Sequence, residues 1–323
     1  MRQVGIAGIA AALPDRRLPL SELLADGSLA STERDLVRSF GIQSVAVATE
    51  SAHDLALAAA RALLAELGME PSALDAVVHV PSRVPERLMS SETTRLQHEL
   101  GASRAVALST GDLGCTSSTA ALYLAESLIK STAGWHNVLV AHGSRSATQG
   151  RVRLPVTVNG DAGIAFLVSD GQTRLAMEGI ELRTDGRYWD LFSVDYLERP
   201  RADWTEACSD PQRYSFHLGL DSRNALGAMV DSLLAASDTK LDQATVVMQN
   251  LSLAAFTFYE QALGTAISDV CRTNLRHLGH LGGADVFVNL VPLMDQAARG
   301  DLLIALNNSP SAAWSACALR VVS

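Results

Sequence analysis

Short apolar runs and helix-forming segments alternate along the first half of the chain. The apolar runs have the length of buried strands and are residues 4–11, 74–80, 105–108, 138–141 and 160–168, the last opening from a glycine turn. The segments between them are rich in helix-forming residues and are residues 18–24, 31–40, 52–68, 91–100 and 120–130. This alternation predicts a parallel sheet with helices on its faces.

The second half repeats this outline. Its predicted strands are residues 244–248, 302–306 and 316–322, and its predicted helices are residues 222–236, 253–263, 268–278 and 286–298. We therefore expect an internally duplicated α/β protein whose halves, residues 1–170 and 171–323, face each other. Within the second half, residues 188–214 form a long irregular excursion of the kind that often covers a site.

Cys115 lies between the predicted strand at residues 105–108 and the predicted helix at residues 120–130. Unpaired amide N–H groups and the positive end of the helix dipole favour a thiolate there, and a thiolate is the form of cysteine that attacks a carbonyl carbon. Because the helix is apolar almost all round, we expect the cysteine to lie deep. An inert core thiol fits the same position, since free cysteine is among the most buried residue types.

Composition limits the classes of function. The chain has 323 residues, 48% of them hydrophobic, which allows an extensive core in two domains or one duplicated domain. A formal net charge of -9 gives no field that attracts a phosphate backbone, so we expect no nucleic-acid partner. The four cysteines show neither metal-binding spacing nor a disulfide framework, which is typical of a reducing cytoplasm. We expect no bound metal.

The N-terminal stretch is only partly like a secretory signal. Arg2 precedes an apolar run at residues 4–13, but that run contains two glycines and ends in Pro-Asp-Arg-Arg, which favours a first buried strand. No stretch of the sequence reaches the roughly 18 to 20 apolar residues that a membrane helix requires. We expect a cytoplasmic protein that does not bind a membrane.

His280 differs from the other histidines in its context. Gly279 precedes it, two more glycines follow, and Asp285 comes five residues later. If the glycines turn the chain back, Asp285 can accept the Nδ1 proton of His280 and fix the tautomer whose Nε2 faces the thiol of Cys115. A solvated loop histidine followed by a helix-capping aspartate is the alternative.

The other glycine patterns give weaker evidence of a function. The glycines at residues 279–283 follow a predicted helix rather than a strand, so they do not match a Rossmann or Walker phosphate-binding loop. Those at residues 160–163 favour a tight turn over nucleotide binding. Ser117 interrupts the Gly-x-nucleophile-x-Gly elbow around Cys115, which disfavours a hydrolase of that fold.

Five motifs spread over nearly the whole chain form a recognisable set: residues 8–14, 40–42, 111–118, 160–163 and 184–186. Together they resemble the ketoacyl-ACP synthase III branch of the thiolase fold. The resemblance implies a five-layered α-β-α-β-α fold, a homodimer, and acylation of Cys115 by a thioester, with no permanently bound cofactor. It also implies that Met89 contacts the acyl group in the partner's pocket.

Two departures from this family bear on the reaction. Condensing members use a histidine from His-Gln-Ala-Asn and an asparagine from Gly-Asn-Thr-Ser to stabilise an enolate. Gln249 stands at the histidine position of this chain and His280 at the asparagine position. With Asp285 behind His280, the pattern resembles the non-condensing acyltransferases of natural-product pathways, such as polyketide and antibiotic biosynthesis.

The donor and the oxyanion hole are less defined. The family residues that hold coenzyme A fall near Asp35 and Ala254, so acyl carrier protein and coenzyme A both remain open as carriers. The family's triple glycine is replaced by residues 307–311. Pro310 has no N–H to donate, so Asn308 or Ser309 is expected to complete the oxyanion hole with the Cys115 N–H.

These observations predict a two-step acyl transfer. Cys115 takes an acyl group from an acyl-ACP or acyl-CoA thioester, and His280, oriented by Asp285, activates a hydroxyl or amine of a small-molecule acceptor. Gln249 is expected to hydrogen-bond the acceptor or the carrier. A condensing synthase that selects a polyketide starter unit and a catalytically silent partner subunit are the alternatives. The sequence leaves the acyl group, aromatic or short aliphatic, and the acceptor open.

Overall fold

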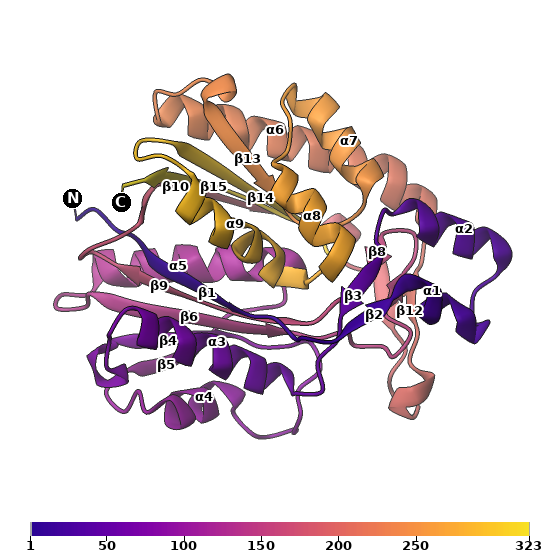
Figure 1. Cartoon of the computed structure of the whole chain (residues 1–323), viewed down its shortest axis with the longest axis horizontal. Coiled ribbons are helices and arrows are strands. Elements are labelled where there is room, and N and C mark those ends of the chain that lie inside the picture. The colour runs from indigo at the N-terminus through magenta and orange to yellow at the C-terminus, as the bar shows by residue number, and fades with distance from the viewer. Residues whose placement is uncertain (1, 323) are drawn as a thin grey trace.

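One large sheet runs through the molecule (Figure 1). The computed structural model describes residues 2–322, and its largest sheet has nine strands in the order β13-β14-β15-β10-β1-β9-β6-β4-β5. Their bounds are β1 Gly5–Ala12, β4 Ala76–Val80, β5 Val106–Ser109, β6 Asn137–Ser144, β9 Ala162–Ser169, β10 Leu175–Thr184, β13 Ala244–Met248, β14 Leu302–Ser309 and β15 Ala313–Val321. Three small sheets pair β2 Arg17–Pro19 with β3 Ser44–Ala46, β7 Val152–Arg153 with β8 Thr157–Val158, and β11 Phe192–Val194 with β12 Glu206–Cys208.

The helices form three layers around the two parts of this sheet. They are α1 Leu20–Leu23, α2 Ser31–Ser39, α3 Ala52–Glu66, α4 Glu92–Leu100, α5 Ser117–Ser131, α6 Gly219–Ala236, α7 Leu253–Leu263, α8 Asp269–Leu278 and α9 Asp285–Gln296. Figure 1 shows α5 and α9 between the two parts, with α3 and α4 outside one part and α6 and α7 outside the other. Accordingly, α5 contacts β6 on one side and β15 on the other, and α9 contacts β1 and β13. The predicted α-β-α-β-α arrangement is confirmed.

The sheet is mixed, so the prediction of a parallel sheet was wrong. Strand β4 pairs in parallel with β5 and β6, and β13 pairs in parallel with β14. Each of these connections contains at least one helix, which carries the chain back to the start of the next strand. The chain passes from β6 to β9, and from β14 to β15, without an intervening α-helix, and these pairs are antiparallel.

The two parts of the sheet meet at β1 and β10 through only two residue pairs, Gly5 with Ala176 and Ile6 with Leu175. The limits proposed for the halves, residues 170 and 171, stay a prediction.

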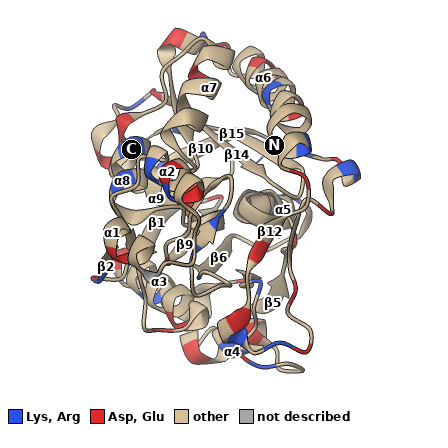
Figure 2. Ribbon diagram, turned by 90° about the vertical axis from the view of Figure 1, so that its right-hand side faces the viewer, with Lys and Arg blue, Asp and Glu red and all other residues tan. Residues whose placement is uncertain are grey.

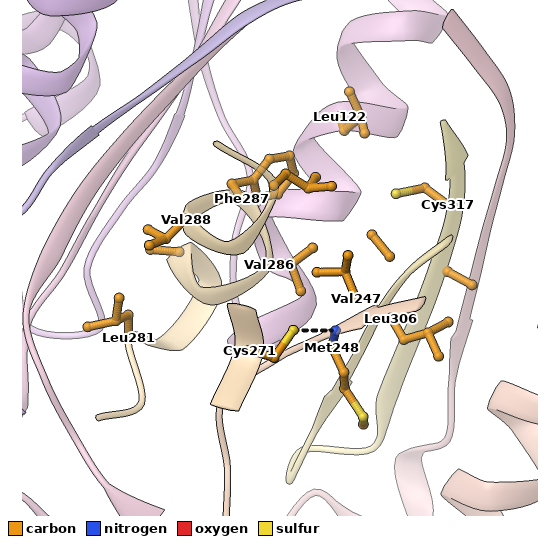
Figure 3. Close-up of a cluster of buried hydrophobic side chains, with 14 of the residues drawn as sticks. Leu122, Val247, Met248, Cys271, Leu281, Val286, Phe287, Val288, Leu306 and Cys317 are labelled. Carbon is orange, nitrogen blue, oxygen red and sulfur yellow. Dashed lines mark hydrogen bonds between the residues drawn. The ribbon is translucent and has the colours of Figure 1, made fainter. Parts of the chain in front are cut away.

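A buried hydrophobic core surrounds α9 (Figure 3). Phe287 is fully buried and stacks on Phe166 of β9, with ring centroids 4.2 Å apart and planes 8° from parallel. Cys271 and Cys317 lie in the same core, and the Sγ of Cys271 accepts the N–H of Met248 at 3.5 Å. These two cysteines therefore behave as small apolar side chains, and burial raises the pKa of each thiol to about 12.

Some local predictions require correction. Residues 18–24 were expected to be helical, but the chain is extended at Arg17–Pro19 and helical only over the four residues Leu20–Leu23, followed by a short 3₁₀ turn. Pro19 precedes the helix with a φ of -60° and extended ψ, so the helix cannot begin before it. Strand β10 was not predicted at all. Only its first two positions are buried and the others are half-buried or exposed, and a bulge between Met177 and Gly179 interrupts its pairing with β15.

A buried ion pair holds the turn before β9. Arg151 donates through Nη1 and Nη2 to the two carboxylate oxygens of Asp161, at 2.8 Å each. The same carboxylate accepts the N–H groups of Ala48 and Ser146, and the Asp161 side chain has no exposed surface. This turn ties three separate segments together and directly follows residues 158–160, which contact the backbone of His280.

Replacing Asp161 with alanine is expected to lower the free energy of unfolding by about 3–5 kcal/mol, because it leaves a buried guanidinium without its carboxylate and the N–H groups of Ala48 and Ser146 without their acceptor. Urea unfolding measures this change. Asp295→Ala is the control: it breaks the Arg174–Asp295 pair, whose aspartate side chain is 72% exposed, and exposed pairs contribute about 1 kcal/mol or less. Equal losses from both variants would contradict the structural role assigned to Asp161.

Candidate active site

Cys115 lies in a single 3₁₀ turn, Gly114–Thr116, that leads directly into α5. The residue is only 4% exposed, as the prediction of a deep cysteine requires. Gly114 has a φ of 57°, which glycine adopts without strain, and a Cβ at this position would lie within 2.2 Å of Ser309 Oγ, so the close packing requires glycine. The sequence Gly-Cys thus places the thiol at the start of the helix, against the end of β14.

The backbone of His280 is fixed on both sides. Its N–H donates to the Val158 carbonyl at 2.9 Å, and its carbonyl accepts the Gly160 N–H at 2.8 Å. Gly279 has a φ of 74°, and a Cβ there would lie 2.6 Å from Val45 Cγ1 and 2.8 Å from the Val158 carbonyl oxygen. The glycine before His280 is therefore needed for the loop to approach β8.

The structure brings Cys115, His280 and Asp285 together. His280 Nε2 lies 3.2 Å from Cys115 Sγ, and His280 Nδ1 lies 2.5 Å from Asp285 Oδ2. Asp285 also accepts the N–H of Leu281 at 2.7 Å and that of Asn250 at 2.8 Å, and it has no exposed surface. The glycines after His280 turn the chain so that Asp285, at the first position of α9, faces back toward the imidazole.

The three groups shift one another's charge states. Burial raises the pKa of Cys115, but the charge of His280 and its hydrogen bond outweigh this and hold the pKa below the usual 9.0. Burial lowers the pKa of His280, but Asp285 and Cys115 raise it to about 10. Both shifts favour the form of the pair with a thiolate and an imidazolium, in which the sulfur is ready to attack a thioester.

Two cavities meet at this pair. Cys115, His280, Arg153 and Pro310 line both of them. The first, called here the polar cavity, has many charged and polar side chains in its lining, among them Arg83, Asp112, His142, Ser144, Arg145 and Asn159. The second is mostly apolar and includes Val156, Tyr214, Leu218, Leu251, Phe258 and Tyr259. With their open mouths counted they enclose about 750 and 700 Å³, so a group bound at Sγ can extend in two chemically different directions.

Gln249 and Asn308 are bonded to each other. The Gln249 Nε2 donates to Asn308 Oδ1, and the Asn308 backbone N–H donates to Gln249 Oε1 at 3.2 Å. Asn308 Nδ2 in turn donates to the Tyr259 hydroxyl at 2.9 Å. The Asn308 N–H is thus already engaged, which leaves Ser309, packed against Gly114, as the better placed of the two residues proposed for the oxyanion hole.

Met89 lies away from both cavities of its own chain. It is fully exposed and has a φ of 67°, within a stretch that has no regular secondary structure. Its expected contact with the acyl group of a partner subunit stays a prediction.

Several residues at the site were missed from the sequence. Arg153 donates through Nε to Glu206 at 2.6 Å, and both side chains are largely buried. Tyr214 and Tyr259 line the apolar cavity. Glu206 and Tyr214 belong to the excursion at residues 188–214, which therefore does reach the site. The only available signal was the cluster of arginines at residues 145–153, and most arginines lie on surfaces.

Known proteins resemble this chain over nearly its whole length. The chain is 26% identical over 342 aligned positions to the β-ketoacyl-[acyl-carrier-protein] synthase III of Cereibacter sphaeroides, covering 98% of both chains. It is 23% identical to the enzyme of the same name from Roseiflexus castenholzii, covering 98% of this chain and 97% of that one. Over its whole length the chain is thus similar to ketoacyl synthase III enzymes, and its fold is that of the thiolase-fold proteins.

Solved structures show that the fold extends over the whole chain. The acyltransferase ChlB3 superposes with a TM-score of 0.85 at 20% identity, covering 99% of this chain and 98% of its own. The synthase FabH of Pseudomonas aeruginosa gives a TM-score of 0.82 at 19% identity, covering 100% and 99%. No protein-family model matches the sequence.

Within residues 2–322, no three His, Cys, Asp or Glu side chains are grouped so that they could hold a metal ion. In the same residues, no helix is both long enough and apolar enough to span a bilayer. Figure 2 shows charged residues of both signs interspersed over the side that it displays.

The charge state of Cys115 can be tested by alkylation. We expect iodoacetamide to modify Cys115 with a midpoint below pH 9, because the nearby imidazolium lowers the thiol pKa. Removing the imidazolium with His280→Ala should move the midpoint upward. Reaction rates as a function of pH, followed by peptide mass, measure this; Cys271 and Cys317, whose pKa values are raised to about 12, are internal controls. An unchanged midpoint in His280→Ala would exclude the ion pair.

Proposed function

We propose that this chain is an acyltransferase that holds an acyl group on Cys115 and delivers it to a hydroxyl or amine without decarboxylative condensation. The observation that carries the proposal is the setting of His280, which has Cys115 Sγ 3.2 Å from one ring nitrogen and Asp285 2.5 Å from the other. A general base oriented by a carboxylate has this arrangement. The likeness to the acyltransferase ChlB3 supports the proposal.

In the first step the Cys115 thiolate attacks the carbonyl carbon of the donor thioester. The oxyanion is stabilised by the Cys115 N–H and a backbone N–H at Ser309. As the intermediate collapses, the bond from the carbonyl carbon to the carrier sulfur breaks, and the His280 imidazolium protonates the leaving thiolate. Cys115 is left as a thioester, and His280 is left neutral.

In the second step neutral His280 accepts a proton from the acceptor hydroxyl or amine. Acylation has removed the thiolate charge that helped to raise the pKa of His280, while Asp285 still stabilises the imidazolium that forms. The acceptor oxygen or nitrogen bonds to the acyl carbon, the bond to Sγ breaks, and the Cys115 thiolate and the His280 imidazolium return.

The donor and the assembly belong to the same proposal. The curated relatives are named as synthases that act on acyl-carrier-protein thioesters, which supports an acyl carrier protein as the partner that delivers the acyl group. Coenzyme A is the other candidate donor. We further propose a cytoplasmic homodimer in which Met89 of each subunit reaches the acyl site of the other, and no permanently bound cofactor.

Intact-mass measurement tests the acyl transfer directly. The protein is incubated with a panel of carrier-bound and CoA-bound acyl groups, and we expect a mass gain on Cys115 that disappears when a hydroxyl or amine acceptor is added. Release of carbon dioxide from a malonyl thioester together with a ketoacyl product would instead identify a condensing synthase. If no acyl group is gained at Cys115 from any donor, a silent partner subunit is the better explanation.

The condensing alternative rests on the names of the curated relatives, which are all ketoacyl synthases. Against it, the position of the family's enolate-stabilising histidine is occupied by Gln249, and both ends of that amide are bonded to Asn308. His280, at the family's asparagine position, is bonded to Cys115 and Asp285. The side chains here are thus arranged to move a proton rather than to hold an enolate.

A further inference from the structure

No step of the acyl transfer proposed above takes place at Arg153, yet this residue lines both cavities beside Cys115. Its side chain is only 14% exposed, and the side chain of its partner Glu206 is 7% exposed. Burial of a guanidinium is costly, and here Glu206 and the nearby Cys115 thiolate offset that cost and raise the pKa of Arg153. Arg153 is therefore a permanently charged group inside the substrate site.

The Arg153 guanidinium has N–H groups that donate to none of the described residues. Arginine carries five N–H groups in a planar fork, and among the described residues the Arg153 side chain makes one hydrogen bond, from Nε to Glu206 Oε1. The Nη end is the part of the fork that matches a carboxylate with two parallel hydrogen bonds. Because Arg153 lines both cavities, a ligand in either of them can meet this end.

The polar cavity adds further positive charge. Arg83 and Arg145 also line it, whereas Asp112 is its only carboxylate among the described residues. Arg145 lies 3.9 Å from Asp161, whose two oxygens are already bonded to Arg151 at 2.8 Å. Arg83 forms no ion pair with the described residues, and its Nη2 reaches the neighbourhood of Gly114, next to Cys115. An anionic ligand is therefore favoured in this cavity over a neutral aliphatic one.

We propose that Arg153 binds a carboxylate on the acyl group carried by Cys115, so that the donor is a monothioester of a dicarboxylic acid. This inference rests on the proposed function, since it needs an acyl group on Cys115. A phosphate of the carrier would offer similar chemistry, but the pantetheine arm places two amide units between its sulfur and its phosphate. Arg153 lines the same two cavities as Cys115, so it is better placed to bind the acyl group than the distant phosphate of the carrier.

The test compares donors of equal shape. Malonyl is paired with 3-methylbutanoyl and succinyl with 4-methylpentanoyl, so that in each pair a carboxylate replaces an isopropyl group of the same branching. Pantetheine thioesters, which lack phosphate, are used first and CoA thioesters second. Acylation rates of Cys115 are followed by intact mass. We expect the carboxylated member to react about 10- to 100-fold faster, the range of a charge-assisted hydrogen bond.

The main variant removes both charges of the buried pair. Arg153→Gln combined with Glu206→Gln leaves no unpaired ion, which protects folding, and should abolish the preference. Any slowing from the loss of the effect of Arg153 on the Cys115 thiol falls equally on both members of a donor pair. Arg153→Lys should keep part of the preference, because it retains the charge but not the fork. Arg199→Gln, which breaks an ion pair whose two side chains are more than half exposed, is the control and should change nothing.

The outcomes separate this inference from the proposed function. If Cys115 is acylated but the double variant keeps the preference, the role of Arg153 is wrong and the acyltransferase proposal stands. If the double variant slows every CoA donor but no pantetheine donor, Arg153 binds the carrier phosphate and the inference is overturned. If Cys115 takes no acyl group from any donor, the proposed function fails first, and the inference fails with it.

Discussion

Cys115→Ala is expected to form no acyl adduct and to lose acyl transfer by about 10⁵-fold or more, the scale on which enzymes lose rate when a catalytic nucleophile is removed. The physical reason is that no other described thiol shares its setting. Cys271 and Cys317 are buried with raised pKa values, and burial also raises the pKa of Cys208, so none of these thiols is a thiolate at neutral pH. Intact mass after incubation with an acyl thioester, and product formation with an acceptor present, measure the two losses.

Cys208→Ala is the matched control because Cys208 is the one of these three thiols that is partly accessible. It should gain the acyl mass at the wild-type rate. An adduct that persists in Cys115→Ala, or one that disappears in Cys208→Ala, would contradict the assignment of the nucleophile. The comparison is informative only if both variants are folded, which the urea midpoint establishes.

The charges around the nucleophile alternate in sign. From one side the order is Asp285, His280 and Cys115, and from the other it is Glu206 and Arg153. The thiolate therefore has a cation on each side, and His280 and Arg153 both lower its pKa. Each cation also has its own buried carboxylate, Asp285 for His280 and Glu206 for Arg153, so neither depends on the thiolate alone to stay charged.

Local patterns predicted the parts of this site that lie close together in the sequence. Helix α7 begins and ends where its composition indicated, at Leu253–Leu263, because apolar spacing and the following glycine define it. The turn from His280 to Asp285 was predictable because five residues and two glycines leave few paths for the chain. The approach of Cys115 to this turn followed from the family resemblance, since 165 residues separate the two.

Contacts between distant segments were not predictable from local patterns. Arg153 and Glu206 are 53 residues apart, and their pairing depends on how the excursion folds over β7. Gln249 and Asn308 are 59 residues apart and meet because β13 and β14 are neighbours in the sheet. In both cases the tertiary fold determines which residues become partners. The sequence therefore shows that polar residues are present, but their hydrogen bonds cannot be predicted from it.

His280→Ala is expected to slow both acylation of Cys115 and transfer to the acceptor by about 10²- to 10⁴-fold, the usual contribution of a general acid and base. Acylation suffers because the imidazolium no longer stabilises the thiolate or protonates the leaving carrier thiol. Transfer suffers because the acceptor loses its base. Single-turnover measurements by intact mass separate the steps: the rate of mass gain reports acylation, and the rate of mass loss on adding acceptor reports transfer.

Variants of Asp285 test whether this residue acts on the reaction through His280. Asp285→Asn should also slow both steps, because the amide cannot stabilise the imidazolium as a carboxylate does and no longer fixes the tautomer whose Nε2 faces Sγ. Residues that act as one unit are not additive, so the double variant His280→Ala with Asp285→Asn should be about as slow as His280→Ala alone. Losses that multiply in the double variant would mean that Asp285 acts on the reaction by a route that does not pass through His280. That outcome would remove the basis for treating the three residues as a triad, since the 2.5 Å contact between Asp285 and His280 would then be structural only.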